Sequence, residues 1–113
     1  MSRIVLVVDD SHLVLDIAAT MLENLGCEVV TASNAKEALA KLSTDPRIEV
    51  LISDINMPGM DGRELAETAM RMHKGLKTIL ISGRLYDCGF PLLRKPFSQE
   101  DLKQSMARST GLC

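Results

Sequence analysis

The sequence predicts an α/β fold in which a doubly wound parallel sheet carries helices on both faces. Short runs of branched apolar residues alternate with longer segments whose apolar residues recur at helical spacing, and this alternation continues along all 113 residues. Continuous apolar strands are typical of parallel sheets, because crossover helices bury both faces of each strand. No linker or internal repeat interrupts the pattern, so residues 1–113 are expected to form one domain.

Five strands and four helices are expected, in alternating order. The strands are expected at 4–8, 29–32, 50–53, 77–82 and 92–94. The first helix should begin near Ser11 and end at Gly26, because glycine favours the left-handed turn that closes many helices. Each later helix should follow a capping residue, Asn34, Asp61 or Ser98, which has an acidic residue three positions further on.

Composition excludes several functional classes. The net charge of −2 gives no electrostatic support for a nucleic-acid partner. No apolar run approaches the ~18 residues of a membrane span, and the amino-terminal run is too short for a signal peptide. A cytoplasmic protein without nucleic-acid or membrane partners is therefore expected. Cys27, Cys88 and Cys113 lack metal-type spacing, so free thiols are expected, with Cys27 buried and a redox role for Cys88 as a minor alternative.

Charged residues follow three of the expected strands. Asp9 and Asp10 come directly after the first strand, Asp54 after the third and Lys95 after the fifth. Because parallel strands bring their carboxyl ends to one edge, these side chains should meet there. Three carboxylates repel one another unless a cation lies among them, and oxygen ligands favour Mg²⁺. Such a site suits phosphoryl transfer to a carboxylate, with the cation and Lys95 neutralising the phosphoryl oxygens.

Each of these residues also has an ordinary alternative role. Asp10 could cap the first helix, Asp54 could belong to a turn before Pro58, and Lys95 could be a solvated surface side chain. Any one of these alternatives is acceptable for a single residue. Four charged residues at strand ends in the expected order are much harder to explain in this way, so the functional interpretation is favoured.

Four stretches resemble the response-regulator receiver family. They are VLVVDDS at 5–11, LISDINMPGMDG at 51–62, ILISG at 79–83 and KPF at 95–97. The resemblance implies a flavodoxin-like sheet of strand order 2-1-3-4-5. It also implies a single-domain response regulator of a two-component or phosphorelay system. Such a protein would receive its phosphoryl group from a sensor histidine kinase or a histidine phosphotransfer protein, and would signal by binding an unknown downstream protein.

The resemblance also implies roles for individual residues. The implied Mg²⁺ ligands are Asp9, Asp10, Asp54 and Asn56. Asp54 would be the phospho-acceptor, and Ser82 and Lys95 would contact the phosphoryl oxygens. Asp9 would act through a water molecule and Asn56 through its backbone carbonyl. The peptide before Pro96, which is often cis in the family, would help to aim the lysine.

The chain departs from the family pattern between Ser82 and Lys95, where the family normally places a complete fourth helix. Only eight residues, 83–90, remain if Pro91 joins the fifth strand. Eight extended residues reach at most ~26–29 Å, which spans a five-residue strand of roughly 17 Å but leaves no room for a multi-turn helix. A loop or single turn is expected instead, in a segment that could become ordered on phosphorylation. Leu92 also replaces the usual aromatic residue, so signal readout should be unusual.

Two other functions are weaker alternatives. The first is a pseudo-receiver whose binding does not depend on phosphorylation, although none of the expected acidic residues is missing. The second is an aspartyl-phosphate phosphatase, which would need an acid/base carboxylate where Asn56 stands. We therefore do not expect an enzyme with turnover on a substrate. Asn56 and Arg84 could set the lifetime of the phosphorylated state, and no output domain is expected, because the sequence ends soon after the last helix.

Overall fold

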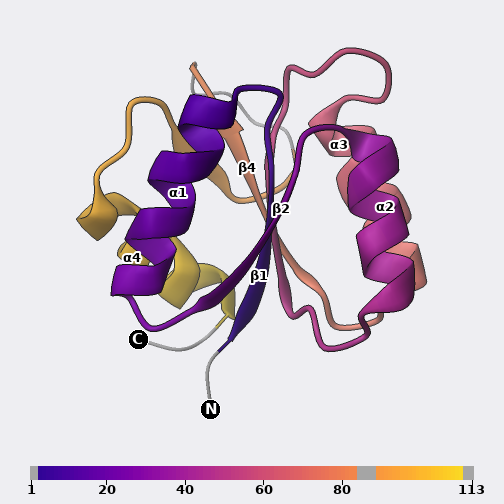
Figure 1. Cartoon of the computed structure of the whole chain (residues 1–113), viewed down its shortest axis with the longest axis horizontal. Helices are drawn as coiled ribbons and strands as arrows, with labels where there is room; N and C mark the ends of the chain where they lie inside the picture. Colours follow the sequence, from indigo (N-terminus) through magenta and orange to yellow (C-terminus); the bar gives the residue numbers. More distant parts are fainter. Residues whose placement is uncertain (1–2, 84–88, 111–113) are drawn as a thin grey trace.

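The computed structural model describes residues 3–83 and 89–110, which form one parallel five-stranded sheet flanked by four helices (Figure 1). The strands are β1 (Ile4–Val8), β2 (Glu28–Ala32), β3 (Val50–Asp54), β4 (Lys77–Ser82) and β5 (Leu92–Arg94). The helices are α1 (His12–Asn24), α2 (Ala35–Thr44), α3 (Gly62–Met72) and α4 (Gln99–Thr110). The strand order is β2-β1-β3-β4-β5, so the predicted fold class and order are confirmed.

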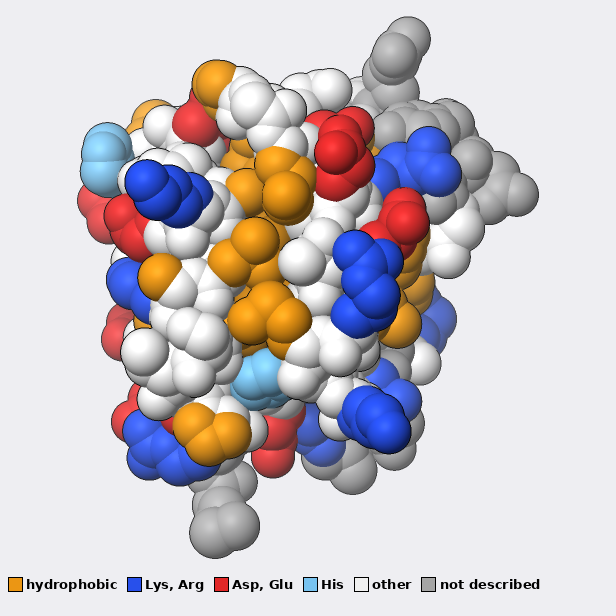
Figure 2. Space-filling view, turned by 90° about the vertical axis from the view of Figure 1, so that its right-hand side faces the viewer, with side chains coloured by type: hydrophobic (Ala, Val, Ile, Leu, Met, Phe, Trp, Pro, Cys, Tyr) orange, Lys and Arg blue, Asp and Glu red, His pale blue; other side chains and the backbone are white. Residues whose placement is uncertain are grey.

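The helices cover the sheet in two pairs. Helices α1 and α4 lie on one face, while α2 and α3 lie on the other (Figure 1). Successive strand residues point to opposite faces, so Val5 and Val7 pack towards α1 and α4, whereas Leu6 and Val8 pack towards α2 and α3. The expected burial of the central strands on both faces is therefore confirmed. On the surface of α2 and α3, hydrophobic side chains form a central band with charged side chains on both sides (Figure 2).

Side-chain caps begin the helices. The three predicted caps, Asn34, Asp61 and Ser98, are confirmed. At α4 the capping is reciprocal, because Ser98 and Asp101 each donate a backbone N–H to the other's side chain at 3.0 Å. Helix α1 is capped by Ser11, whose Oγ accepts a hydrogen bond from the N–H of Val14 at 3.4 Å. Asp10 is therefore not the cap of this helix, and its carboxylate is free for another role.

The connection from β4 to β5 is short, as expected. Its described residues, Gly83 and 89–91, include no helix. The rest of the connection, 84–88, lies outside the described residues. The roles considered for Arg84 in the lifetime of the phosphorylated state and for Cys88 in redox chemistry fall in this segment. Leu92, which replaces the usual aromatic residue, is half-buried at the start of β5. Nine residues, 83–91, therefore separate β4 from β5, where the resemblance implies a complete fourth helix.

Cys27 is only half-buried, whereas a buried thiol was expected, because it lies in the turn between α1 and the edge strand β2. It packs against the core under α1 and α4. Burial raises the pKa of the Cys27 thiol, and the positive charge of Arg3 offsets only part of that rise. The described part of the chain contains no helix with the length and apolar composition that a bilayer crossing requires.

Thr78→Val is expected to stabilise the protein by about 1 kcal/mol, because an unpaired buried hydroxyl is replaced by a methyl group of similar size. Thr78 is buried in β4, and within residues 3–83 and 89–110 its Oγ1 has no hydrogen-bond partner. Urea unfolding followed by circular dichroism measures the change. Thr78→Ser, which keeps the hydroxyl and loses the methyl group, should destabilise. A loss of stability in Thr78→Val would instead reveal a partner for the hydroxyl.

Candidate functional site

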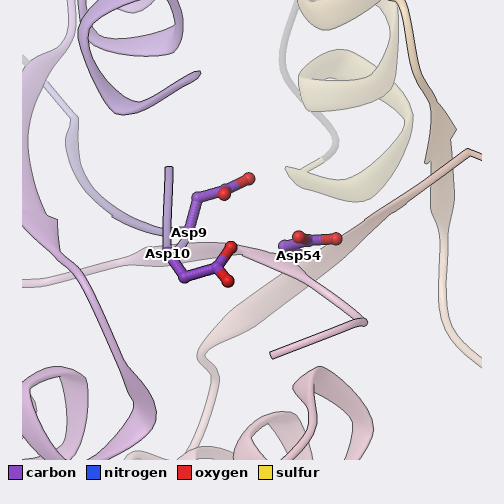
Figure 3. Close-up of side chains that lie close together, drawn as sticks. All are labelled: Asp9, Asp10 and Asp54. Carbon is purple, nitrogen blue, oxygen red and sulfur yellow. The ribbon is translucent and has the colours of Figure 1, made fainter. Parts of the chain in front are cut away.

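Strands β1 and β3 are neighbours and end side by side. Val8 pairs with Ser53 in the register of the two strands, so the residues that follow lie at the same edge of the sheet. Figure 3 shows the result, with the side chains of Asp9 and Asp10 from the end of β1 gathered near that of Asp54 from the end of β3. One carboxylate oxygen from each aspartate lies within 4.8 Å of the others. The sheet thus brings together three acidic groups that are distant in sequence.

The two aspartates after β1 differ in burial. The backbone N–H of Asp9 donates to the carbonyl of Ala32 at 3.2 Å, which continues the pairing of β1 with β2. Asp9 is only 1% exposed, and its Oδ1 accepts a hydrogen bond from the N–H of Ser11 at 2.9 Å. Asp10, the next residue, is exposed. The site therefore has a fixed inner carboxylate and an outer carboxylate that faces solvent.

Asp54 is the last residue of β3, one position inside the strand rather than directly after it. The strand continues because Asp54 pairs with Ile81 of β4. The residue is 6% exposed, and its Oδ1 accepts a long hydrogen bond of 3.4 Å from the N–H of Asn56. Asn56 itself is exposed beside it. Ser82, which ends β4, is buried next to this edge of the sheet.

Gly62 holds the turn after Asp54 in place, and the sequence did not reveal this role. Its N–H donates to the carbonyl of Ile55 at 2.9 Å. A Cβ on Gly62 would lie 2.4 Å from the backbone oxygen of Asp54 and 2.8 Å from Cα of Ile55. Only glycine fits there without movement of the backbone. The sequence offered one signal for this role. Gly62 stands at the first position of a predicted helix, where glycine lowers helix stability and therefore needs another reason to be present.

Lys95 brings a positive charge to the aspartates. Its Nζ lies 3.3 Å from Oδ2 of Asp9 and 3.4 Å from Oδ2 of Asp54. The N–H of Lys95 donates to the carbonyl of Ser82 at 2.7 Å, so β4 positions the residue directly. The peptide between Lys95 and Pro96 is cis, as the resemblance implied. Because β5 is parallel to β4, Lys95 lies at the same edge as the three aspartates.

The electrostatics of the site leave an excess of negative charge. Burial raises the pKa of Asp54, and Asp9 raises it further, while the ammonium of Lys95 lowers it. Burial alone would lower the pKa of Lys95, but the attraction of Asp54 and Asp9 outweighs burial and raises it. One ammonium does not neutralise three carboxylates. A second cation would therefore relieve the remaining repulsion.

The donor set fits a hard metal ion. The aspartates Asp9, Asp10 and Asp54 supply only oxygen atoms, and those atoms already lie close together. Carboxylates at a partly solvent-facing site are the ligands that Mg²⁺ and similar ions prefer. These three residues could therefore hold a metal ion, and an ion there would oppose the repulsion between them.

A groove of about 420 Å³ adjoins the acidic site, and the sequence did not reveal it either. It is lined by Val14, Ile17, Lys95, Pro96 and Phe97. Lys95 is thus shared between the groove and the aspartates. The apolar rim continues along α1, where Leu13 is 69% exposed and Ile17 is 43% exposed.

Comparison with known proteins gives a consistent result. The sequence model that describes the response regulator receiver domain family matches residues 5–107 of this chain. Protein PilG of Pseudomonas aeruginosa is 33% identical, over 87% of this chain and 80% of PilG. Sensor histidine kinase GacS of Pseudomonas protegens is 32% identical over 96% of this chain, which spans only 13% of GacS. Among solved structures, chemotaxis protein CheY4 of Vibrio cholerae superposes with a TM-score of 0.89 at 30% identity, covering 96% of this chain and 99% of CheY4.

Proposed function

The chain belongs to the response-regulator receiver family, and from this premise we propose that it accepts a phosphoryl group on Asp54 in a Mg²⁺-dependent reaction. One observation carries the proposal. Asp54 lies at a sheet edge where Asp9 and Asp10 offer metal-ligand oxygens and Lys95 offers an ammonium 3.4 Å from the Asp54 carboxylate. This is the combination that a carboxylate nucleophile needs when it attacks a negatively charged phosphoryl group.

The chemistry of the transfer assigns a role to each side chain. An Asp54 oxygen attacks phosphorus while the phosphorus–nitrogen bond to the donor histidine breaks, and the leaving imidazole nitrogen keeps that electron pair and takes up a proton. Lys95 stabilises the negative charge on the phosphoryl oxygens, and the Ser82 hydroxyl donates a hydrogen bond to one of them. Bound Mg²⁺, held by Asp9, Asp10, Asp54 and the Asn56 carbonyl, would neutralise further charge.

We propose that residues 1–113 act as one receiver domain in the cytoplasm. Its donor would be a phosphohistidine on a sensor kinase or a phosphotransfer protein, and its output would be the binding of a downstream protein. The family membership and the similarity to PilG, of which the chain spans 80%, support this proposal.

Incubation with Mg²⁺ and acetyl phosphate is expected to add the mass of one phosphate to the intact protein. Borohydride reduction of an aspartyl phosphate gives homoserine, so peptide mapping after reduction should find the changed residue at position 54. Chelation of Mg²⁺ should abolish the mass increase, because the repulsion among the aspartates is then unopposed. No added mass under any condition would refute phosphorylation and favour a phosphorylation-independent binding module.

The apolar groove beside Lys95 is the proposed docking surface for the phosphodonor protein. A protein that delivers a phosphoryl group to Asp54 must cover the surface around it. On the α1 side, that surface is the groove with its exposed rim of Leu13 and Ile17. Exposed apolar area next to a reactive site is typical of a protein-binding surface.

Ile17→Glu is expected to slow transfer from a phosphohistidine protein by at least roughly tenfold, because a charge in an apolar contact opposes docking. Transfer from acetyl phosphate should remain unchanged, since that donor needs no docking surface. Met70→Glu is a matched control, because Met70 on α3 is also 43% exposed and lies on the opposite face of the sheet. Rates can be followed with any phosphohistidine protein that phosphorylates the wild type. Equal effects of both variants would remove the groove from the docking surface.

A further inference from the structure

Within the part of the chain that the structure describes, the outer edge of β5 is open. In the strand order, β5 is the last strand on one side of the sheet. Its bonds to β4 involve the carbonyl of Pro91 and the N–H of Lys95, so every second residue of the strand bonds inward. Leu92 and Arg94 are the alternate residues, and their N–H and C=O groups point away from β4. No backbone group within residues 3–83 and 89–110 pairs with these outward groups.

Pro96 limits this edge at its carboxyl end. It follows β5 closely, it is the next position after Arg94 whose groups would point away from β4, and it has no N–H to donate. Pro91 bonds inward through its carbonyl, so it leaves the outward groups unchanged, and β5 itself spans only Leu92–Arg94. What remains is a short edge of two donors and two acceptors, enough to bind an extended segment but too short to support uncontrolled sheet growth.

A groove of about 320 Å³ runs beside this edge, and its walls are charged. Besides β5 and Pro96, the groove is lined by Asp101, Gln104 and Arg108, which share one face of α4. Asp101 already accepts the hydrogen bond from Ser98 that caps the helix. Arg108 and Arg94 form no ion pair within the part of the chain that the structure describes. Among the described residues that line the groove, unpaired positive charge therefore exceeds negative charge.

We propose that an acidic, extended segment of a partner protein binds this edge as a sixth strand. Main-chain hydrogen bonds to Leu92 and Arg94 would supply the pairing, as in other cases of strand addition. Leu93 points into the core under α1 and α4, so Arg94 points to the opposite face of the sheet. Neighbouring residues of the added strand would also point to opposite faces. Two consecutive acidic residues would then meet Arg108 on one face and Arg94 on the other.

Charge argues against a second copy of this chain as the occupant. Pairing of two β5 strands would bring a second Arg94 and a second Arg108 to the same edge, with only a second Asp101 to balance them. Like charges across adjacent strands are unfavourable. An acidic partner instead gains attraction from the same two arginines, so the groove favours a different protein with acidic side chains.

The probe for this surface is a fluorescein-labelled peptide, acetyl-Thr-Val-Glu-Asp-Val-Thr-amide. Binding to the whole unphosphorylated chain without Mg²⁺ is measured by anisotropy, and the contact is located by the amide NMR shifts of Leu92 and Arg94. Two matched peptides test the chemistry, one with Gln and Asn in place of the acidic pair and one N-methylated at both central residues. Because neither Mg²⁺ nor a phosphodonor is present, the result does not depend on whether Asp54 is phosphorylated.

The acidic peptide is expected to bind, and Arg94→Gln and Arg108→Gln should each weaken binding about fivefold, the scale of a solvent-accessible ion pair. Lys103→Gln is the matched control, because it removes a positive charge from α4 outside the groove, and it should leave binding unchanged. The neutral peptide should bind more weakly, and the N-methylated peptide should not bind.

Four results would overturn the proposal. The first is no binding of the acidic peptide, and the second is equal binding of the neutral or N-methylated peptide. The third is an effect of Lys103→Gln as large as that of Arg108→Gln. The fourth is a concentration-dependent dimer in sedimentation that excludes the peptide, since that result would assign the edge to a second copy.

Discussion

Gly62→Ala is expected to lower the free energy of unfolding by about 3 kcal/mol, at the upper end of the range for overpacking. The added Cβ would lie 2.4 Å from the backbone oxygen of Asp54 and 3.0 Å from its carbonyl carbon. No rotamer change relieves a contact with backbone, so α3 or the end of β3 must move. Alanine favours helices by about 1 kcal/mol over glycine, but this gain is smaller than the steric cost.

The same substitution is expected to impair function. Movement of the Asp54 backbone would displace its carboxylate from the ammonium of Lys95, so phosphorylation by acetyl phosphate should also slow. Gly83→Ala is the matched control, because no atom of residues 3–83 and 89–110 lies within 4 Å of a Cβ built there and its φ is not positive. Urea unfolding of both variants measures the difference. Wild-type stability in Gly62→Ala would show that the helix start does not approach Asp54 so closely.

Asp54→Asn is expected to abolish phosphorylation and to stabilise the protein in Mg²⁺-free buffer. The amide is not a nucleophile towards phosphorus, so no mass increase should follow incubation with acetyl phosphate. Stability should rise above neutral pH as well as at it, because a carboxylate whose pKa is raised by folding disfavours the folded state when it is charged. The physical reason is that Asp54 is buried beside Asp9, and both facts raise the pKa of Asp54 and disfavour its charged form.

The effect of Mg²⁺ on stability gives a second readout for this variant. Mg²⁺ at ten times its dissociation constant should stabilise the wild type by about 1.4 kcal/mol through mass action. Asp54→Asn should lose most of that gain, because one ligand is gone and the repulsion is weaker. Asp16→Asn is the control, since Asp16 is an exposed aspartate of α1 outside the acidic cluster. Full Mg²⁺ stabilisation in Asp54→Asn would place the ion elsewhere.

The sequence by itself determined the elements and the chemistry of the site. Residues 4–8 form a strand as predicted, and Asn34 and Asp61 begin helices as predicted, because apolar period and capping act over only a few residues. The parallel α/β class was predicted from the alternation of apolar strands with segments of helical periodicity. The strand order followed from family resemblance rather than from any local pattern. Asp9, Asp10 and Asp54 could be identified because each stands at the end of a predicted strand, and strand ends can be predicted from the local sequence.

The tertiary structure alone decided how distant segments meet. The pairing of Asp54 with Ile81 extends β3 by one residue, and the placement of Lys95 between Asp9 and Asp54 depends on the register of β5 against β4. The tight approach of Gly62 to Asp54 is likewise a contact between a helix start and a strand end. Register and packing arise from the simultaneous fit of many side chains, so local periodicity carries no signal for them. Packing also placed the groove beside the edge of β5, which no other described strand covers.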